Sequence, residues 1–246
     1  MYNKKNILLI HDAKIRLING SDPLHDERHA ERVATYAFDI ASRLGITGQY
    51  EIDALEISAW WHDVSRTITK KPSFLLMPCI DDTLSAIMLG ITIIKFRSFS
   101  RSSWLAFRLV LSKSVATGKI FSRMFLSKKV HVLLDILHDA DTVDTFASER
   151  TDVIHDMVGT SRIYERGYKM MIWWFASVEY FDMKTVVAKE YLMQVLKELL
   201  EWVSQDHIQI WHIERYGEEW LQKMIDRLII VMNTLHRELF LVITDV

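Results

Sequence analysis

The distribution of proline constrains the fold of this chain more than any other feature of the sequence. Only Pro23, Pro72 and Pro78 occur in 246 residues, so no proline interrupts the chain after position 78. Proline removes a backbone donor and clashes with the preceding turn, which makes it the strongest helix breaker. Glycine is also sparse, with 8 residues. The sequence therefore predicts long helices rather than strands, and an all-α fold.

Apolar residues recur at intervals of three and four in several segments, as they do on one face of a helix. This pattern predicts helices over residues 2–17, 28–44, 51–65, 129–146, 185–203 and 214–242. Asp26 is the expected N-cap of the second of these helices, and Gly45 its expected stop. Over 66–129 the pattern is weaker and predicts shorter helices joined by loops.

The whole chain, 1–246, is expected to form a single helical domain. Its core motifs fall within 20–150, and 151–246 would add C-terminal helices. Within that extension, the apolar stripe Trp220, Met224, Leu228, Val231 and Leu235 is interpreted as core, with a homodimer interface as the alternative.

Composition limits the class of protein. Half of the residues are hydrophobic and the formal net charge is −2, which suits a globular core and argues against a general polyanion binder. The single cysteine, Cys79, cannot form an intramolecular disulfide. The apolar run 7–10 is too short for a signal peptide, and the longest one, near 86–94, falls short of the ~20 residues that span a bilayer. We therefore expect a cytoplasmic protein without a membrane partner.

Histidine and aspartate carry the chemical signal. Five His-Asp dipeptides occur, so the pair alone is weak evidence; they begin at His11, His25, His62, His138 and His155. Only His62-Asp63 closes an apolar helical segment, for which a solvated helix end is the alternative interpretation. His29, 33 residues upstream, and Asp141, 78 residues downstream, each share an apolar helix face.

A divalent cation would explain these inward polar residues. A buried imidazole or carboxylate without a partner is costly, and one ion would satisfy all of them. The predicted ligands are His29, His62, Asp63 and Asp141, a donor set that suits Mn, Fe, Co, Ni or Zn better than Ca. Asp139 stays an alternative last ligand, although periodicity places it on a polar face with Asp135.

Three segments together resemble the motifs of the HD superfamily of metal-dependent phosphohydrolases. Residues 22–33 (DPLHDERHAERV) resemble the first motif, 61–66 (WHDVSR) the central His-Asp motif, and 139–144 (DADTVD) the final aspartate motif. Order and spacing agree over roughly 20–150. Two departures, Ser65 where many members have glycine and Val143 where leucine is usual, remove no ligand.

The resemblance implies an all-helical HD fold and a bound divalent metal, with Mg added to the candidate ions. It implies hydrolysis of a nucleotide or other small phosphoester by a metal-activated water. Asp63 would also orient that water. His25 would act as an acid on the leaving oxygen, with a helix-capping role or simple exposure to solvent as the alternatives. Arg66 would contact phosphate or form an outward salt bridge. The alternative function is a non-catalytic metal-binding regulatory module.

Between Thr83 and Leu134 there are nine basic residues and no acidic one: Lys95, Arg97, Arg101, Arg108, Lys113, Lys119, Arg123, Lys128 and Lys129. This asymmetry predicts either steering of an anionic substrate toward the site or a solvated helical face. Interleaved aromatic residues leave nucleic-acid binding conceivable, but we do not expect it.

Overall fold

The structure, a computed structural model, describes residues 4–68, 77–114, 118–160, 162–170 and 183–244. Within these ranges every regular element is a helix, and no strand is present. The predicted all-α fold is therefore confirmed. The chain divides into two compact units, Met1–Asp141 and Thr142–Val246. The expectation of a single folding domain stays a prediction.

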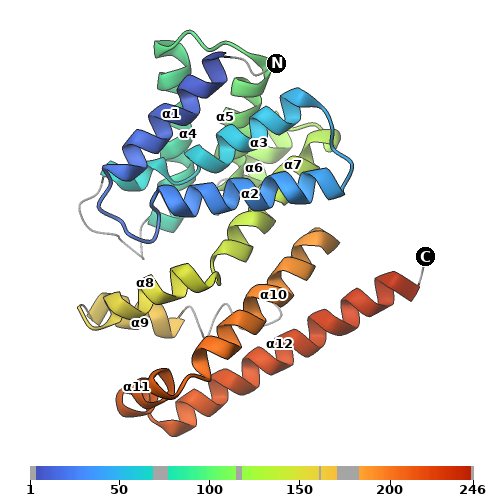
Figure 1. Ribbon diagram of the computed structural model, residues 1–246. Helices are drawn as coiled ribbons and strands as arrows, with labels where there is room; N and C mark the ends of the chain where they lie inside the picture. Colours follow the sequence, from blue (N-terminus) through green and yellow to red (C-terminus); the bar gives the residue numbers. More distant parts are fainter. Residues whose placement is uncertain (1–3, 69–76, 115–117, 161, 171–182, 245–246) are drawn as a thin grey trace. The chain divides into compact units, whose positions relative to one another are not determined.

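Within the described ranges, the first unit contains seven helices (Figure 1) and one short 3₁₀ helix. These elements are α1 (Lys4–Ile18), α2 (Glu27–Arg43), α3 (Gln49–Trp61), η1 (Val64–Ile68), α4 (Met77–Lys95), α5 (Arg101–Lys113), α6 (Gly118–Phe125) and α7 (Lys128–Asp144). The division between the two units falls in the last turn of α7.

Helix α3 is the central element of the first unit. It packs against α1, α2, α4 and α5, and its residues from Ile57 to Trp61 are all buried. A helix that is apolar on every side belongs inside a domain rather than at its surface. Because α3 ends at Trp61, the next two residues, His62 and Asp63, emerge inside the unit, where both are buried.

Buried polar contacts tie α1 to this core. The Asn6 amide donates to Asp53 Oδ2 and to Ser102 Oγ, both at 2.9 Å. The indole of Trp61 donates to the Leu9 carbonyl at 3.0 Å. A buried polar group is tolerated when it is hydrogen-bonded, and these bonds specify how α1 lies on α3 and α5.

Both ends of α2 follow the sequence prediction. The Asp26 carboxylate accepts a hydrogen bond from the backbone N–H of His29 at 3.0 Å, as an N-cap does. At the other end Gly45 has φ +74°, in the left-handed region, and the helix stops there. Since the cap bonds to His29 itself, the start of α2 and the position of this histidine are fixed together.

The second unit contains α8 (Ser148–Val158), α9 (Arg162–Met170), α10 (Val186–Val203), α11 (Asp206–Tyr216) and α12 (Glu218–Thr244). Helix α10 packs on α8, α11 and α12. Met224, Leu228, Val231 and Leu235 of the predicted C-terminal stripe are buried. Trp220 is half-buried in an aromatic cluster with Tyr168, His212 and Tyr216.

The predicted helices α2, α7 and α10 match the structure to within two residues at each end, and α1 does so at its C-terminal end. The predicted start of α1 at residue 2 lies outside the described residues. Three expectations were wrong. The helix predicted over 51–65, which is α3, stops at Trp61, because the chain turns into η1. Helix α4 has 19 residues, although the middle region was expected to hold short helices. The last helix was predicted to begin at residue 214, but α12 begins at Glu218. The preceding residues, 206–216, form a separate helix, which ends at Gly217 with φ +90°.

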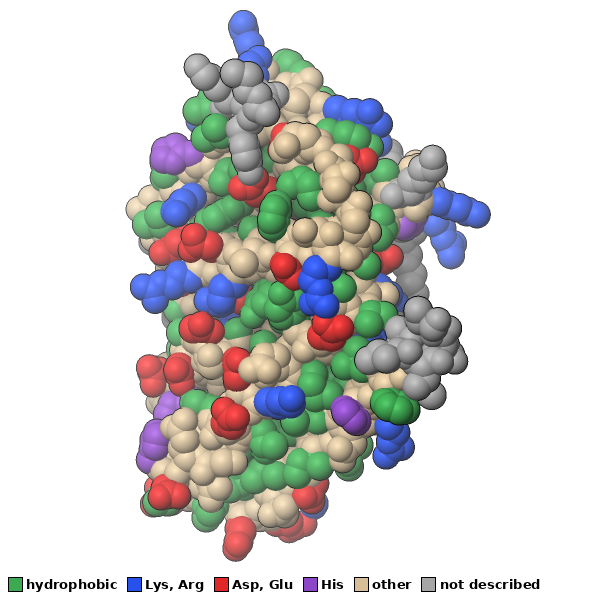
Figure 2. Space-filling view, turned by 45° about the vertical axis from the view of Figure 1, so that its right-hand side comes forward, with side chains coloured by type: hydrophobic (Ala, Val, Ile, Leu, Met, Phe, Trp, Pro, Cys, Tyr) green, Lys and Arg blue, Asp and Glu red, His purple; other side chains and the backbone are tan. Residues whose placement is uncertain are grey.

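In the part of the chain that the structure describes, no helix is both long and apolar enough to cross a membrane. On the face drawn in Figure 2, acidic and basic side chains are interspersed with hydrophobic ones.

The turn after α2 can be tested by mutation. A Cβ at position 45 would meet no atom within 4 Å, so Gly45→Ala adds backbone strain without a clash. We expect it to lower the free energy of unfolding by about 1 kcal/mol in urea titrations. Gly159→Ala, at φ −69° and also in open space, is the control and should cost nothing. Equal costs at the two positions would contradict the argument.

Candidate metal centre

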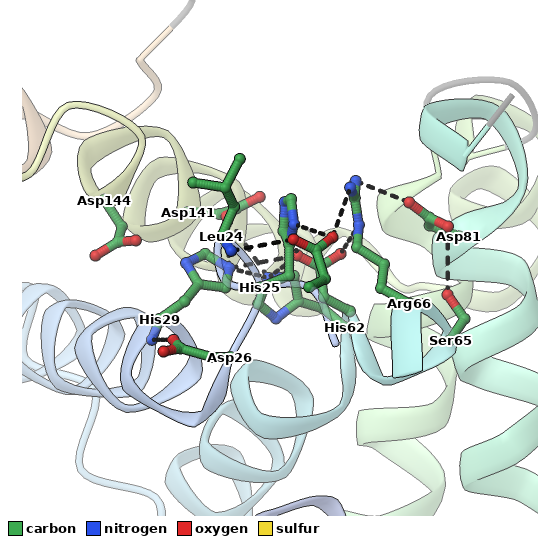
Figure 3. A network of polar contacts seen from close by, with 12 residues as sticks. Leu24, His25, Asp26, His29, His62, Ser65, Arg66, Asp81, Asp141 and Asp144 are labelled. Atoms are coloured by element: carbon green, nitrogen blue, oxygen red, sulfur yellow. Dashed lines mark hydrogen bonds and ion pairs between the residues drawn. The ribbon is translucent and has the colours of Figure 1, made fainter. Parts of the chain in front are cut away.

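Three helices of the first unit bring the predicted ligands together (Figure 3). His29 lies in the first turn of α2, His62 is the C-cap residue of α3 with Asp63 directly after it, and Asp141 lies in the last turn of α7. His29 and His62 are almost completely inaccessible, whereas the Asp141 side chain is 25 % exposed. The cluster is therefore buried on the histidine side and reachable beside Asp141.

The donor atoms converge on one point. His29 Nε2 lies 3.1 Å from His62 Nε2. Asp63 Oδ2 lies 3.3 Å from each of these nitrogens, and Asp141 Oδ1 lies 3.5 Å from each of them. Each of the two carboxylate oxygens therefore lies within 3.5 Å of both histidine nitrogens.

These separations fit a coordination sphere. Transition-metal bonds to imidazole nitrogen and carboxylate oxygen are about 2.0–2.2 Å long, so neighbouring ligand atoms in tetrahedral or octahedral geometry lie roughly 2.9–3.6 Å apart. The measured separations fall inside that interval. His29, His62 and Asp141 form a group that can hold a metal ion, and Asp63 Oδ2 lies at the same spacing.

A backbone contact orients His62 for this role. Its Nδ1 lies 2.7 Å from the carbonyl oxygen of Ala59, one turn earlier in α3. Because a carbonyl only accepts, Nδ1 carries the proton and donates it. Once Nε2 has lost its proton, the neutral ring presents the lone pair of this atom to the cluster, as a metal-binding histidine does.

In this cluster the charges of neighbouring groups outweigh the effect of burial on each pKa. Burial alone would lower the pKa of His62, but the charges of Asp63 and Asp141 outweigh burial and raise the pKa to about 10. Burial would raise the pKa of both carboxyl groups. The charge of His62 holds the pKa of Asp63 well below its usual range, and Lys113 does the same for Asp141.

His25 lies beside the cluster rather than on the surface. Its Nδ1 is 2.9 Å from Asp22 Oδ2, and its Nε2 is 3.8 Å from Asp63 Oδ2. Burial would raise the pKa of Asp22, but the hydrogen bond and charge of His25 outweigh it and lower the pKa. Asp22 thus holds the His25 ring with Nε2 toward the ligands. Capping of α2 belongs to Asp26 and not to His25.

Arg66 points inward and not to solvent. Its Nη2 lies 2.8 Å from Asp81 Oδ2, and its Nε lies 3.5 Å from Asp63 Oδ1 (Figure 3). A third carboxylate, Asp22, lies 3.9 Å from Nη1. The predicted outward salt bridge is therefore wrong for Arg66, because η1 turns this side chain back toward α4. Its predicted contact with phosphate stays a prediction.

Sequence reasoning missed three side chains that belong to this site. Lys113 Nζ, at the end of α5, lies 2.8 Å from Asp141 Oδ2 and 3.6 Å from Asp82 Oδ1. Asp81 and Asp82 are adjacent in the first half of α4, and both are buried. In the sequence, Asp81 and Asp82 are a pair of acidic residues before a long basic segment that contains Lys113. This pattern does not predict which of these side chains lie near the ligands.

Position in the structure favours Asp141 over Asp139 as the last ligand, but the prediction that Asp139 lies on a polar face was wrong. Asp139 was expected on a polar face, yet it is only 2 % exposed. Helix α7 is buried on more than one side, with Ile136, Leu137 and Ala140 all inaccessible. Only Asp141 belongs to the group of ligand atoms among the described residues.

Of the nine basic residues predicted to steer a substrate, Lys113 alone is seen at the site. Lys95, Arg97 and Arg101 are exposed, and Arg101 lies over the Tyr50 ring at 4.0 Å. The side chains of Lys119 and Lys129 lie outside the described residues. The steering role stays a prediction.

The five His-Asp dipeptides separate clearly by position. His62 and Asp63 are both at the site, while the second dipeptide contributes His25 to the cluster and Asp26 to the helix cap. Asp12 instead pairs with Arg16 on α1. Context along the chain was thus the right criterion for choosing among them.

Comparisons with known protein families, with curated proteins and with solved structures find no match for this chain.

The last ligand can be identified by substitution. Asp141→Asn removes the carboxylate charge that lies 3.5 Å from both histidines, so we expect loss of bound metal by elemental analysis. Asp139→Asn changes an equally buried carboxylate outside the cluster and should keep the metal. Both variants should remain helical by circular dichroism. The reverse ranking would move the ligand to Asp139.

The raised pKa of His62 predicts how metal affinity depends on pH. In the metal-free protein this ring keeps its proton up to about pH 10, so an incoming cation must displace that proton. Apparent affinity should therefore rise with pH below 10, by up to about tenfold per unit. Calorimetric titration with Zn²⁺ in buffers of different ionisation enthalpy measures the released proton. A pH-independent affinity between pH 6 and 8 would contradict the assignment of His62 as a ligand.

Proposed function

We propose that the first unit is a metal-dependent phosphohydrolase of the HD type, acting on a nucleotide or other small phosphoester. The observation that carries the proposal is the group of four donor atoms from His29, His62, Asp63 and Asp141 at coordination spacing. These are the residues that the H…HD…D motif selects. A structural domain has little need for two imidazoles and two carboxylates around one buried point.

The donor set favours a transition metal among the candidate ions. Two neutral imidazoles and two single carboxylate oxygens suit Mn, Fe, Co, Ni or Zn. When bound, such an ion lowers the pKa of a water molecule and polarises a phosphoryl oxygen. Four protein ligands leave positions open in an octahedral ion, and the partial exposure of Asp141 gives a small substrate a route to them.

The remaining side chains divide the work of proton transfer and charge balance. His25, held through Nδ1 by Asp22, can deliver a proton from Nε2 to a leaving oxygen. Asp63 presents one oxygen to the histidines and is placed to orient a water molecule next to them. Arg66 stabilises the local negative charge, although its ion pairs with Asp63 and Asp81 compete with a phosphate.

The competing function is a metal-binding regulatory module without turnover. Both readings need the same ligands, so metal content alone does not separate them. His25 supports the enzyme, because a buried Asp22–His25 pair beside the ligands suits proton transfer to a leaving group. A cytoplasmic location, a homodimer and the absence of nucleic-acid binding stay predictions.

A substrate screen tests the proposal. Wild-type protein loaded with Mn²⁺, Co²⁺, Zn²⁺ or Mg²⁺ is offered nucleoside mono-, di- and triphosphates, cyclic nucleotides and sugar phosphates. Release of phosphate, pyrophosphate or nucleoside product is expected with at least one pair, and a chelator should abolish it. The His62→Ala variant should be silent under the same conditions. A folded, metal-loaded wild type without any turnover would favour the regulatory module.

His25 provides a test that leaves the ligands intact. His25→Gln removes the proton carrier but not a ligand atom, so we expect kcat to fall about 100-fold while metal content is unchanged. The pH dependence of kcat should lose the limb that requires a protonated imidazole. An unchanged kcat would leave His25 without a catalytic role, whatever the metal does.

A further inference from the structure

The two carboxylate ligands share an arrangement that the ligand motif does not explain. In each, one oxygen faces the histidines and the other faces a cationic side chain. Asp63 turns Oδ2 to His29 and His62, and Oδ1 to Arg66 Nε at 3.5 Å. Asp141 turns Oδ1 to the same histidines and Oδ2 to Lys113 Nζ at 2.8 Å.

Each of these cations is in turn held by an aspartate from α4. Arg66 Nη2 lies 2.8 Å from Asp81 Oδ2, and Lys113 Nζ lies 3.6 Å from Asp82 Oδ1. The two aspartates are neighbours in sequence and point to different cations. Both are more than nine-tenths buried.

Further contacts fix this part of α4 to the chain that follows the His-Asp pair. The backbone N–H of Ser65 donates to Ser85 Oγ at 3.0 Å, and the Ser65 hydroxyl donates to Asp81 Oδ1 at 3.3 Å (Figure 3). Serine at position 65 therefore has a contact that glycine could not make. The α4 aspartates are positioned against η1 and do not merely neutralise charge from a distance.

We propose that α4 carries an outer layer of the metal centre, in which Asp81–Arg66 and Asp82–Lys113 hold the outer oxygens of Asp63 and Asp141. Each of these two aspartates then presents a single oxygen to the ion, namely the oxygen that faces the two histidines. This inference rests on the metal site of the proposed function but not on its hydrolytic activity. Asp81, Asp82 and Lys113 are positioning residues, because they act through the ligands.

The physical reason for such a layer is orientation. A carboxylate with a free outer oxygen can rotate to bind an ion through both oxygens, which uses an extra coordination position. A cation on the outer oxygen holds the single-oxygen geometry and keeps that position for water or substrate. Because Lys113 is buried and the Arg66 side chain is only 14 % exposed, each benefits from a second carboxylate that offsets its charge, and α4 supplies one to each.

The test measures dissociation constants for Zn²⁺ and Mn²⁺ alone, by competition with a chromophoric chelator at fixed pH. The paired variant Asp82→Asn/Lys113→Met removes one anion and one cation, so the net charge of the site is unchanged. We expect its dissociation constant to rise roughly 10- to 100-fold, as for other partners of metal ligands. Lys113→Arg keeps a cation beside Asp141 and should retain most of the affinity.

A matched control excludes a general effect of removing buried charge. Asp53 is a buried aspartate on α3, the helix that leads to His62, but its carboxylate binds Asn6 and Gln49 instead of the cluster. Asp53→Asn should lower stability and leave metal affinity unchanged. If Asp53→Asn weakens binding as much as the paired variant does, the outer layer has no specific role.

If the paired variant does not fold by circular dichroism, the single isosteric changes Asp81→Asn and Asp82→Asn decide the question. At least one should weaken metal binding several-fold while thermal unfolding stays close to that of Asp53→Asn. Wild-type dissociation constants for both would overturn the proposal. All these readouts are obtained without substrate, so a protein that binds metal through this layer but hydrolyses nothing would contradict only the proposed function.

Discussion

The mutual neutralisation of buried charge between the ends of α2, α3 and α7 is the interaction on which the first unit depends. Two imidazoles lie 3.1 Å apart, and each of two carboxylates lies within 3.5 Å of both of them, where each group alone would be costly to desolvate. Neighbouring groups offset this cost: Arg66 pairs with Asp63, Lys113 pairs with Asp141, and the Ala59 carbonyl accepts a hydrogen bond from His62. The same arrangement that makes the cluster tolerable also leaves it suited to an ion.

The sequence predicted the helices and the ligands for related reasons. Apolar periodicity located α2 and α7, and the same periodicity showed that His29 and Asp141 share their apolar faces. Helix α3 was located although it is buried on nearly every side, but its end was placed too late, because the turn into η1 has no apolar signature. Strong local patterns were therefore reliable, and the ends of the helices were less so.

The rest of the site depends on tertiary placement that no local pattern encodes. No sequence pattern distinguished Lys113 from the other eight basic residues of its segment. Only the packing of α5 beside α4 and α3 buries Lys113 while others stay exposed. Asp81 and Asp82 follow a segment without a clear pattern. For Asp139 the prediction was wrong in another way. Its polar neighbours indicated an exposed face, but α7 is buried on several sides, and Asp139 is buried with it.

The N-cap of α2 has a consequence for how this site tolerates change in length. Asp26 fixes the first turn, and His29 lies three residues later on the same turn. A residue inserted between them would rotate the imidazole by about 100° around the helix axis and direct it away from its partners. An insertion before Asp22, in the loop that joins α1 to the first motif, would leave every one of these angles intact. Related chains should therefore vary in length before Asp22 and keep a constant length between Asp22 and His29.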